Sequence, residues 1–101
     1  MLYLTDMLTA RKLQAIGLPI FEADAETIKS MLEEEEWQSR IKKQSNADLL
    51  SRILEMKIEV NKEPVVIAEL REHDVLVTFT VKKRSKKQNK DTVIFYFVVI
   101  M

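Results

Sequence analysis

The sequence has no cysteine, a single glycine at position 17 and only two prolines, at positions 19 and 64. Without cysteine, neither disulfide bonds nor thiolate metal sites can form. One glycine is too few for a glycine-rich phosphate-binding loop. The longest apolar run lies at the C-terminus, from residue 93 to residue 101, and is far shorter than the roughly 20 residues of a membrane-spanning helix. The N-terminus also lacks the basic and apolar regions of a secretory signal.

The chain has 101 residues, of which 47% are apolar and 32% charged. This length and balance predict one globular domain that spans residues 1–101. We expect no association with membranes and a cytoplasmic location. The only histidine, His73, follows a predicted strand in a turn, and no catalytic triad can be assembled around it. We therefore expect neither a metal nor another cofactor.

The formal net charge is zero, with 16 basic and 16 acidic residues, but the two signs are segregated along the chain. Residues 22–36 are strongly acidic and end in four consecutive glutamates. Consecutive side chains on a helix fan out instead of converging, so these glutamates do not predict a cation site. Residues 82–90 are basic and contain no acid, so this segment could attract an anionic partner.

Apolar periodicity predicts an α/β fold of the α+β type, with a mixed, mostly antiparallel sheet of about five strands flanked by two or three helices. Strands are expected at residues 2–5, 20–22, 65–70, 75–81 and 93–100, with strand periodicity also at 56–60, and helices at about 25–36 and 46–54. We expect the third and fourth of these strands to form an antiparallel hairpin. Because the last strand is apolar on both faces, it should be central or buried at an interface.

Residues 39–54 are expected to form a basic loop that runs directly into a helix. Ser45 or Asn46 can serve as the N-cap, and Asp48 lies three residues after the serine, as in a capping box. Four apolar side chains then share one helix face, namely Leu49, Leu50, Ile53 and Leu54.

Lys42 and Lys43 stand just ahead of this predicted helix N-terminus. The backbone N–H groups of a helix start carry partial positive charge and attract anions. The stretch thus combines an apolar anchor with a candidate phosphate site. An ordinary amphipathic helix after a solvated basic turn would give the same pattern.

Several short strings carry a resemblance to a known family. They are residues 1–5, residues 39–41 with Ala47, Leu50 and Ser51 in the following helix, residues 61–62, and residues 74–77 with Arg84. With the order of elements, they resemble the viral ring-nuclease anti-CRISPR family, whose members come from archaeal viruses, phages and bacterial mobile elements. The resemblance implies a homodimer with a mixed sheet flanked by helices. It also implies binding of cyclic tetra-adenylate across the dimer interface, and cleavage by a histidine acid with an arginine and a glutamate, without metal.

This chain departs from the family pattern at the catalytic positions. The glycine–histidine pair is replaced by Lys42 and Lys43, and the glutamate by Lys87. The ligand-loop asparagines fall at Asp6 and Arg11. A lysine ammonium is a much poorer proton donor to a leaving alkoxide than a histidine, but it still neutralises phosphate as a point charge.

The sequence therefore favours a homodimer that binds and sequesters a cyclic oligonucleotide second messenger without efficient cleavage, and so counters host defence. The expected ligand-binding residues are Asp6, Thr9, Arg11, Lys42, Lys43, Ser45, Arg84 and Lys87. One alternative is an active, metal-independent ring nuclease that degrades cyclic tetra-adenylate. Another is a non-enzymatic protein that binds host protein or nucleic acid through the basic loop from Lys82 to Lys90.

Overall fold

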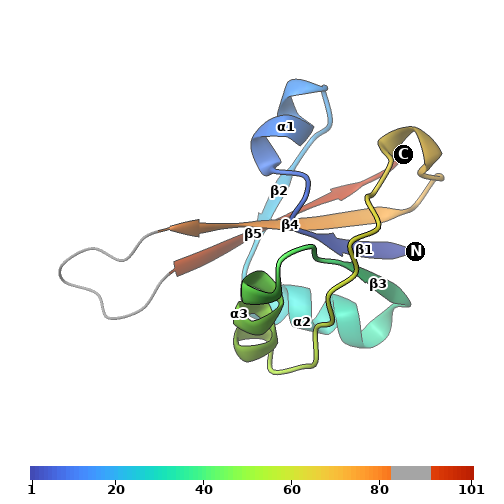
Figure 1. Cartoon of the computed structure of the whole chain (residues 1–101). Coiled ribbons are helices and arrows are strands. Elements are labelled where there is room, and N and C mark those ends of the chain that lie inside the picture. The colour runs from blue at the N-terminus through green and yellow to red at the C-terminus, as the bar shows by residue number, and fades with distance from the viewer. Residues whose placement is uncertain (83–91) are drawn as a thin grey trace.

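The computed structural model describes residues 1–82 and 92–101. In chain order the elements are β1 (Leu2–Thr5), α1 (Ala10–Ala15), β2 (Phe21–Ala23), α2 (Ala25–Glu34), β3 (Trp37–Arg40), α3 (Gln44–Leu54), the 3-10 turn η1 (Ile67–Glu69), β4 (Val75–Lys82) and β5 (Thr92–Val99). Within the described residues the strands form one five-stranded sheet in the order β2-β5-β4-β1-β3 (Figure 1). The α+β class, the mixed sheet and the flanking helices are confirmed.

One strand of this sheet, β5, runs against the other four. β1 runs parallel to both of its neighbours, β3 and β4. β5 runs antiparallel to β4 over eight residue pairs, from Val75↔Val99 to Lys82↔Thr92, and also antiparallel to β2. The carboxyl ends of β1, β3 and β4 therefore lie at the same edge of the sheet.

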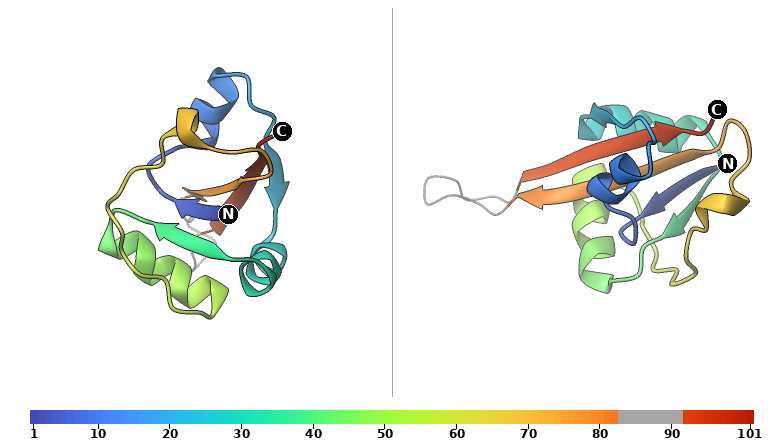
Figure 2. Two further views of the ribbon diagram at one scale, coloured as in Figure 1. Left: turned by 90° about the vertical axis from the view of Figure 1, so that its right-hand side faces the viewer. Right: turned by 90° about the horizontal axis from the view of Figure 1, so that it is seen from above.

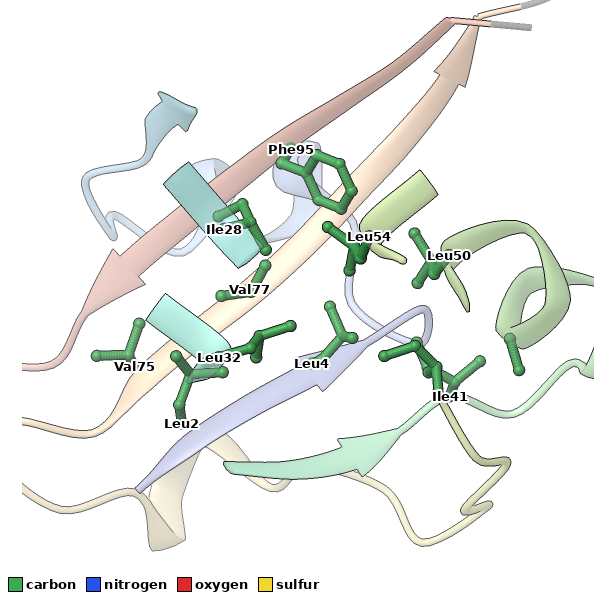
Figure 3. Packing of buried hydrophobic residues seen from close by; sticks show 12 residues of the cluster. Leu2, Leu4, Ile28, Leu32, Ile41, Leu50, Leu54, Val75, Val77 and Phe95 are labelled. Atoms are coloured by element: carbon green, nitrogen blue, oxygen red, sulfur yellow. The ribbon is translucent and has the colours of Figure 1, made fainter. Parts of the chain in front are cut away.

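The two faces of the sheet are covered by different helices (Figure 2). On one face α2 and α3 bury Ile28 and Leu50 against Leu4, Val77 and Phe95 of the strands (Figure 3). On the other face, α1 and the segment around η1 pack against the opposite sides of β4 and β5. This smaller cluster contains Leu13, Leu76 and Val98, with Val65, Ile67 and Leu70 against it. The alternation expected for the strand at residues 75–81 is thus confirmed.

Local signals placed several elements correctly. Asp24 caps α2, because its Oδ1 accepts a hydrogen bond from the backbone N–H of Thr27 at 2.8 Å. Gly17 follows α1 with a φ of +88°, which a glycine adopts without a Cβ penalty. β5 is confirmed as an inner strand, because it lies between β2 and β4.

The predicted cap of α3 is wrong. The helix begins at Gln44, its N-cap is Lys43, and this residue makes no side-chain capping bond. Neither Ser45 nor Asn46 is the N-cap, and Asp48 instead accepts from the side-chain amide of Gln44 at 2.9 Å. The carboxylate of Asp6, from a distant part of the chain, instead bonds the backbone N–H groups of Lys42 and Lys43 just ahead of the helix.

The predicted hairpin that begins at residue 65 is also wrong. Residues 65–70 contain η1 and no strand, and β4 pairs with β5 instead. The apolar side chains of this segment serve to cover Leu76 and Val98. Residues 56–60 contribute one isolated bridge, Ile41↔Val60, while β3 occupies residues expected to begin the basic loop.

Among residues 1–82 and 92–101, no helix is both long and apolar enough to cross a membrane.

Candidate functional site

The neighbouring parallel strands β1 and β3 send the chain to opposite faces of the sheet. After β1 the chain enters α1, whose Leu13 is buried on one face. After β3 it enters α3, whose Leu50 is buried on the other face. The two helices begin on either side of the end of β1 (Figure 1). In open α/β sheets, such a switch point beyond the carboxyl ends of the strands is where ligands commonly bind.

Asp6 joins the two sides of this switch point. It follows β1 directly, and its carboxylate accepts hydrogen bonds from the backbone N–H groups of Lys42 at 2.8 Å and Lys43 at 3.1 Å. A third bond comes from the side-chain amide of Asn46 at 2.8 Å. Asp6 therefore already occupies two backbone N–H groups ahead of α3.

These bonds set the ionisation of Asp6. Partial burial alone would raise the pKa of its carboxyl group. The hydrogen bonds from Asn46, Lys42 and Lys43 outweigh that effect together, and the pKa lies below its ordinary value. The carboxylate is therefore charged at neutral pH and binds the loop after β1 to the start of α3.

The α1 side of the switch point is also fixed by hydroxyl groups. Thr5 is fully buried and its Oγ1 accepts from the backbone N–H of Met7 at 3.0 Å. Thr78 donates its hydroxyl to the carbonyl of Leu8 at 2.6 Å. Thr9 is the N-cap of α1, since its Oγ1 accepts from the N–H of Lys12 at 3.1 Å. The loop that leads into α1 is thus held against the sheet along its length.

The structure brings most of the sequence-predicted site residues to this one edge. Lys42, Lys43 and Ser45 are exposed at the start of α3, and Arg11 is exposed in the first turn of α1. Lys82 lies five residues after Val77, the partner of Leu4, on the part of β4 that projects past this edge. The remaining two expected residues, Arg84 and Lys87, lie outside the described residues. Exposed cations thus flank the switch point on both sides.

The only histidine of the chain lies elsewhere. His73 stands just before β4, and its backbone N–H donates to the carbonyl of Ile100 at 2.6 Å. Its side chain is 79% exposed, with Nε2 3.7 Å from Glu72 Oε1. Because it precedes β4, it lies at the amino end of that strand, at the edge opposite Lys43. A histidine acid is therefore absent from the basic edge, which is the edge of the sheet where Arg11, Lys42 and Lys43 lie.

Arg40 is a mostly covered cation in a segment whose sequence predicted a basic loop. It ends β3, its side chain is 12% exposed, and its guanidinium carbon lies 5.2 Å from the centroid of the Tyr3 ring. Nη1 lies 3.2 Å from Glu63 Oε2, and Nη2 donates to Gln38 Oε1 at 2.6 Å. Nε is buried and has no partner in the described part of the chain. Because two lysines follow Arg40, the sequence looked like a basic loop, and the position of Arg40 in a strand was not predicted.

Comparison with known protein families assigns the chain to one of them. A family model described as STIV B116-like matches residues 3–93. The chain belongs to the STIV B116-like family. This is a family of small viral proteins. The STIV B116-like match includes both β1 and the start of α3, and therefore the basic edge. A search of curated proteins found no match.

Within the described ranges, no three His, Cys, Asp or Glu side chains gather in a way that could hold a metal ion.

Proposed function

We propose that this STIV B116-like protein binds and sequesters a cyclic oligonucleotide second messenger of host immunity, of the cyclic oligoadenylate type, as a homodimer and without efficient cleavage. The observation that carries the proposal is the set of exposed cations at the switch point between β1 and β3, where Asp6 bonds the backbone of Lys42 and Lys43. The viral family supports a role against host defence.

Charge at this edge suits a cyclic polyanion. Lys42, Lys43 and Arg11 are exposed there, and a two-fold symmetric dimer would double each charge. The backbone N–H groups of the two lysines already bond Asp6, so the ammonium groups of their side chains would meet the phosphates. Arg84 and Lys87 are also expected to contact the ligand.

Weak or absent cleavage is expected because the only histidine does not lie at the basic edge of the sheet. General acid–base help typically accelerates a reaction by about 10²–10⁴-fold. Lys43 is a poor acid, and His73 lies at the opposite edge of the sheet. A ring nuclease that uses other groups would cut the ligand, so chromatography of ligand recovered from the protein distinguishes the two functions. No binding at all would favour a protein that acts through its basic loop.

A homodimer is the expected assembly. The proposal needs a dimer in which the two switch points face each other, so that cations of both subunits reach one cyclic ligand. Light scattering at micromolar concentration should give about twice the chain mass of 11.8 kDa. A mass equal to one chain would contradict the dimer and weaken the ligand proposal, which needs charges from two subunits.

A further inference from the structure

Two buried threonines, Thr5 and Thr78, lie under the loop that joins β1 to α1. In the parallel register of β1 and β4 they stand two positions after the paired residues Tyr3 and Leu76, which pack on the α1 face of the sheet. Because side chains alternate along a strand, both threonines point to that same face. Their exposed fractions are 0% and 1%.

Both hydroxyl groups bond the backbone of the loop. Thr5 Oγ1 accepts from the N–H of Met7 at 3.0 Å, and Thr78 Oγ1 donates to the carbonyl of Leu8, 70 residues earlier in the chain, at 2.6 Å. A buried hydroxyl group destabilises a fold unless it is hydrogen-bonded. Valine has nearly the same shape and buries more apolar surface, so packing alone does not account for threonine at these two positions.

The same loop connects the cations on the two sides of the switch point (Figure 1). Asp6, at its start, bonds the backbone N–H groups of Lys42 and Lys43. Thr9, at its end, is the N-cap of α1, and the first turn of that helix contains the exposed Arg11. The loop carbonyl that is bonded from β4 lies between these two ends. Its position therefore helps to set the distance between the arginine and the two lysines.

We infer that Thr78 is a positioning residue, which fixes the spacing of the cations across the switch point and thereby favours a cyclic oligonucleotide over a linear one. Its hydroxyl group is too deeply buried to touch a ligand and acts through the carbonyl of Leu8. A ring holds its phosphates at restricted distances, whereas a linear chain adapts to a site that moves, so a preorganised site benefits the ring more. The inference rests on the proposed function and deepens it, because it names what selects the ring.

The test compares the parent chain with Thr78→Val, which removes the hydroxyl group and keeps the shape of the side chain. Isothermal titration calorimetry at matched ionic strength measures two ligands, cyclic tetra-adenylate and a linear tetra-adenylate whose terminal phosphate gives it as many phosphates as the ring. The variant should bind the ring about fivefold more weakly, as the loss of one hydrogen bond predicts, and the linear ligand within about twofold of the parent. The preference of the parent chain for the ring should therefore fall.

Three further variants separate positioning from a general loss of stability. Thr78→Ser restores the hydroxyl group and should recover the preference for the ring. Ile28→Val removes one buried methyl group from α2, on the other face of the sheet, so it should lower stability and keep the preference of the parent. Thr5→Val removes the other bond to the loop and should reduce the preference as Thr78→Val does, which keeps the inference testable if the latter variant does not fold.

The positioning role and the proposed function fail in different ways. A parent chain that binds the ring, with a Thr78→Val variant that keeps the same preference or loses both ligands equally, would overturn the positioning role and leave the proposed function standing. Failure of Thr78→Ser to recover the preference would also overturn that role. A parent chain that binds neither ligand would contradict the proposed function itself, and the role of Thr78 with it.

Discussion

Lys43→Glu should weaken binding of cyclic tetra-adenylate by at least about tenfold, which corresponds to about 1.4 kcal/mol. The variant replaces an exposed cation at the switch point by an anion, so an attraction to phosphate becomes a repulsion. Two-fold symmetry would repeat the change in each subunit of the dimer. Isothermal titration calorimetry at matched ionic strength measures the difference, since phosphate contacts make affinity salt-dependent.

Lys57→Glu is the matched control, because it makes the same charge change beyond the other end of α3. The Lys57 side chain is 84% exposed and lies 3.4 Å from Glu59. This variant should bind cyclic tetra-adenylate nearly as well as the parent chain, because solvent and salt screen a distant surface charge. Equal losses from the two variants would show diffuse attraction instead of a defined site.

Asp6→Ala should lower the free energy of unfolding by about 1–2 kcal/mol at pH 7, the cost of losing hydrogen bonds to a charged, partly exposed carboxylate. The variant removes the carboxylate that bonds the backbone N–H groups of Lys42 and Lys43 and the side chain of Asn46. Asp48→Ala is the control, because it removes an exposed carboxylate from α3, the helix that follows the backbone bonded by Asp6. Its effect should stay within about 0.5 kcal/mol, as for most surface substitutions. Urea denaturation followed by circular dichroism measures both.

The stabilisation that the Asp6 carboxylate provides should depend on pH. Hydrogen bonds lower the pKa of Asp6 in the folded state below its ordinary value of 3.8. Its contribution to stability is therefore complete above that ordinary value and is lost as the pH falls through the folded-state pKa. The gap in unfolding free energy between the parent chain and Asp6→Ala should narrow in the same range. A gap that stays constant into acid would show that the carboxylate charge is not what stabilises the loop.

Local patterns were sufficient for the elements that depend on local rules. The alternation from Val75 onward predicted β4 and its two faces, and Asp24 predicted the start of α2. Both signals lie within a few residues of the structure they specify. The apolar run through Phe95 and Val98 predicted an inner strand, since a strand buried on both faces cannot alternate.

Non-local contacts account for the elements that the sequence analysis missed. α3 has no local cap because Asp6, 36 residues before Lys42, bonds the chain at its start. The segment with η1 has the composition of a strand, but its apolar side chains cover the sheet instead of joining it. Arg40 resembled part of a basic loop, and only its pairing in β3 places its guanidinium over the Tyr3 ring.

The candidate site was partly predictable for the same reason. The basic residues Lys42 and Lys43 stand out in the sequence, and the topology places them at a switch point. The involvement of Asp6 with their backbone could not be predicted, because it depends on the parallel pairing of β1 and β3.

The central claim is binding without efficient cleavage, and one measurement tests it most directly. Purified protein is incubated with cyclic tetra-adenylate in the presence of a chelator and separated from free ligand. The ligand is then released by denaturation and analysed by chromatography. We predict that it is recovered bound and intact, at one ring per dimer. Rapid conversion to linear products by the parent chain, or no ligand recovered with the protein, would contradict the account.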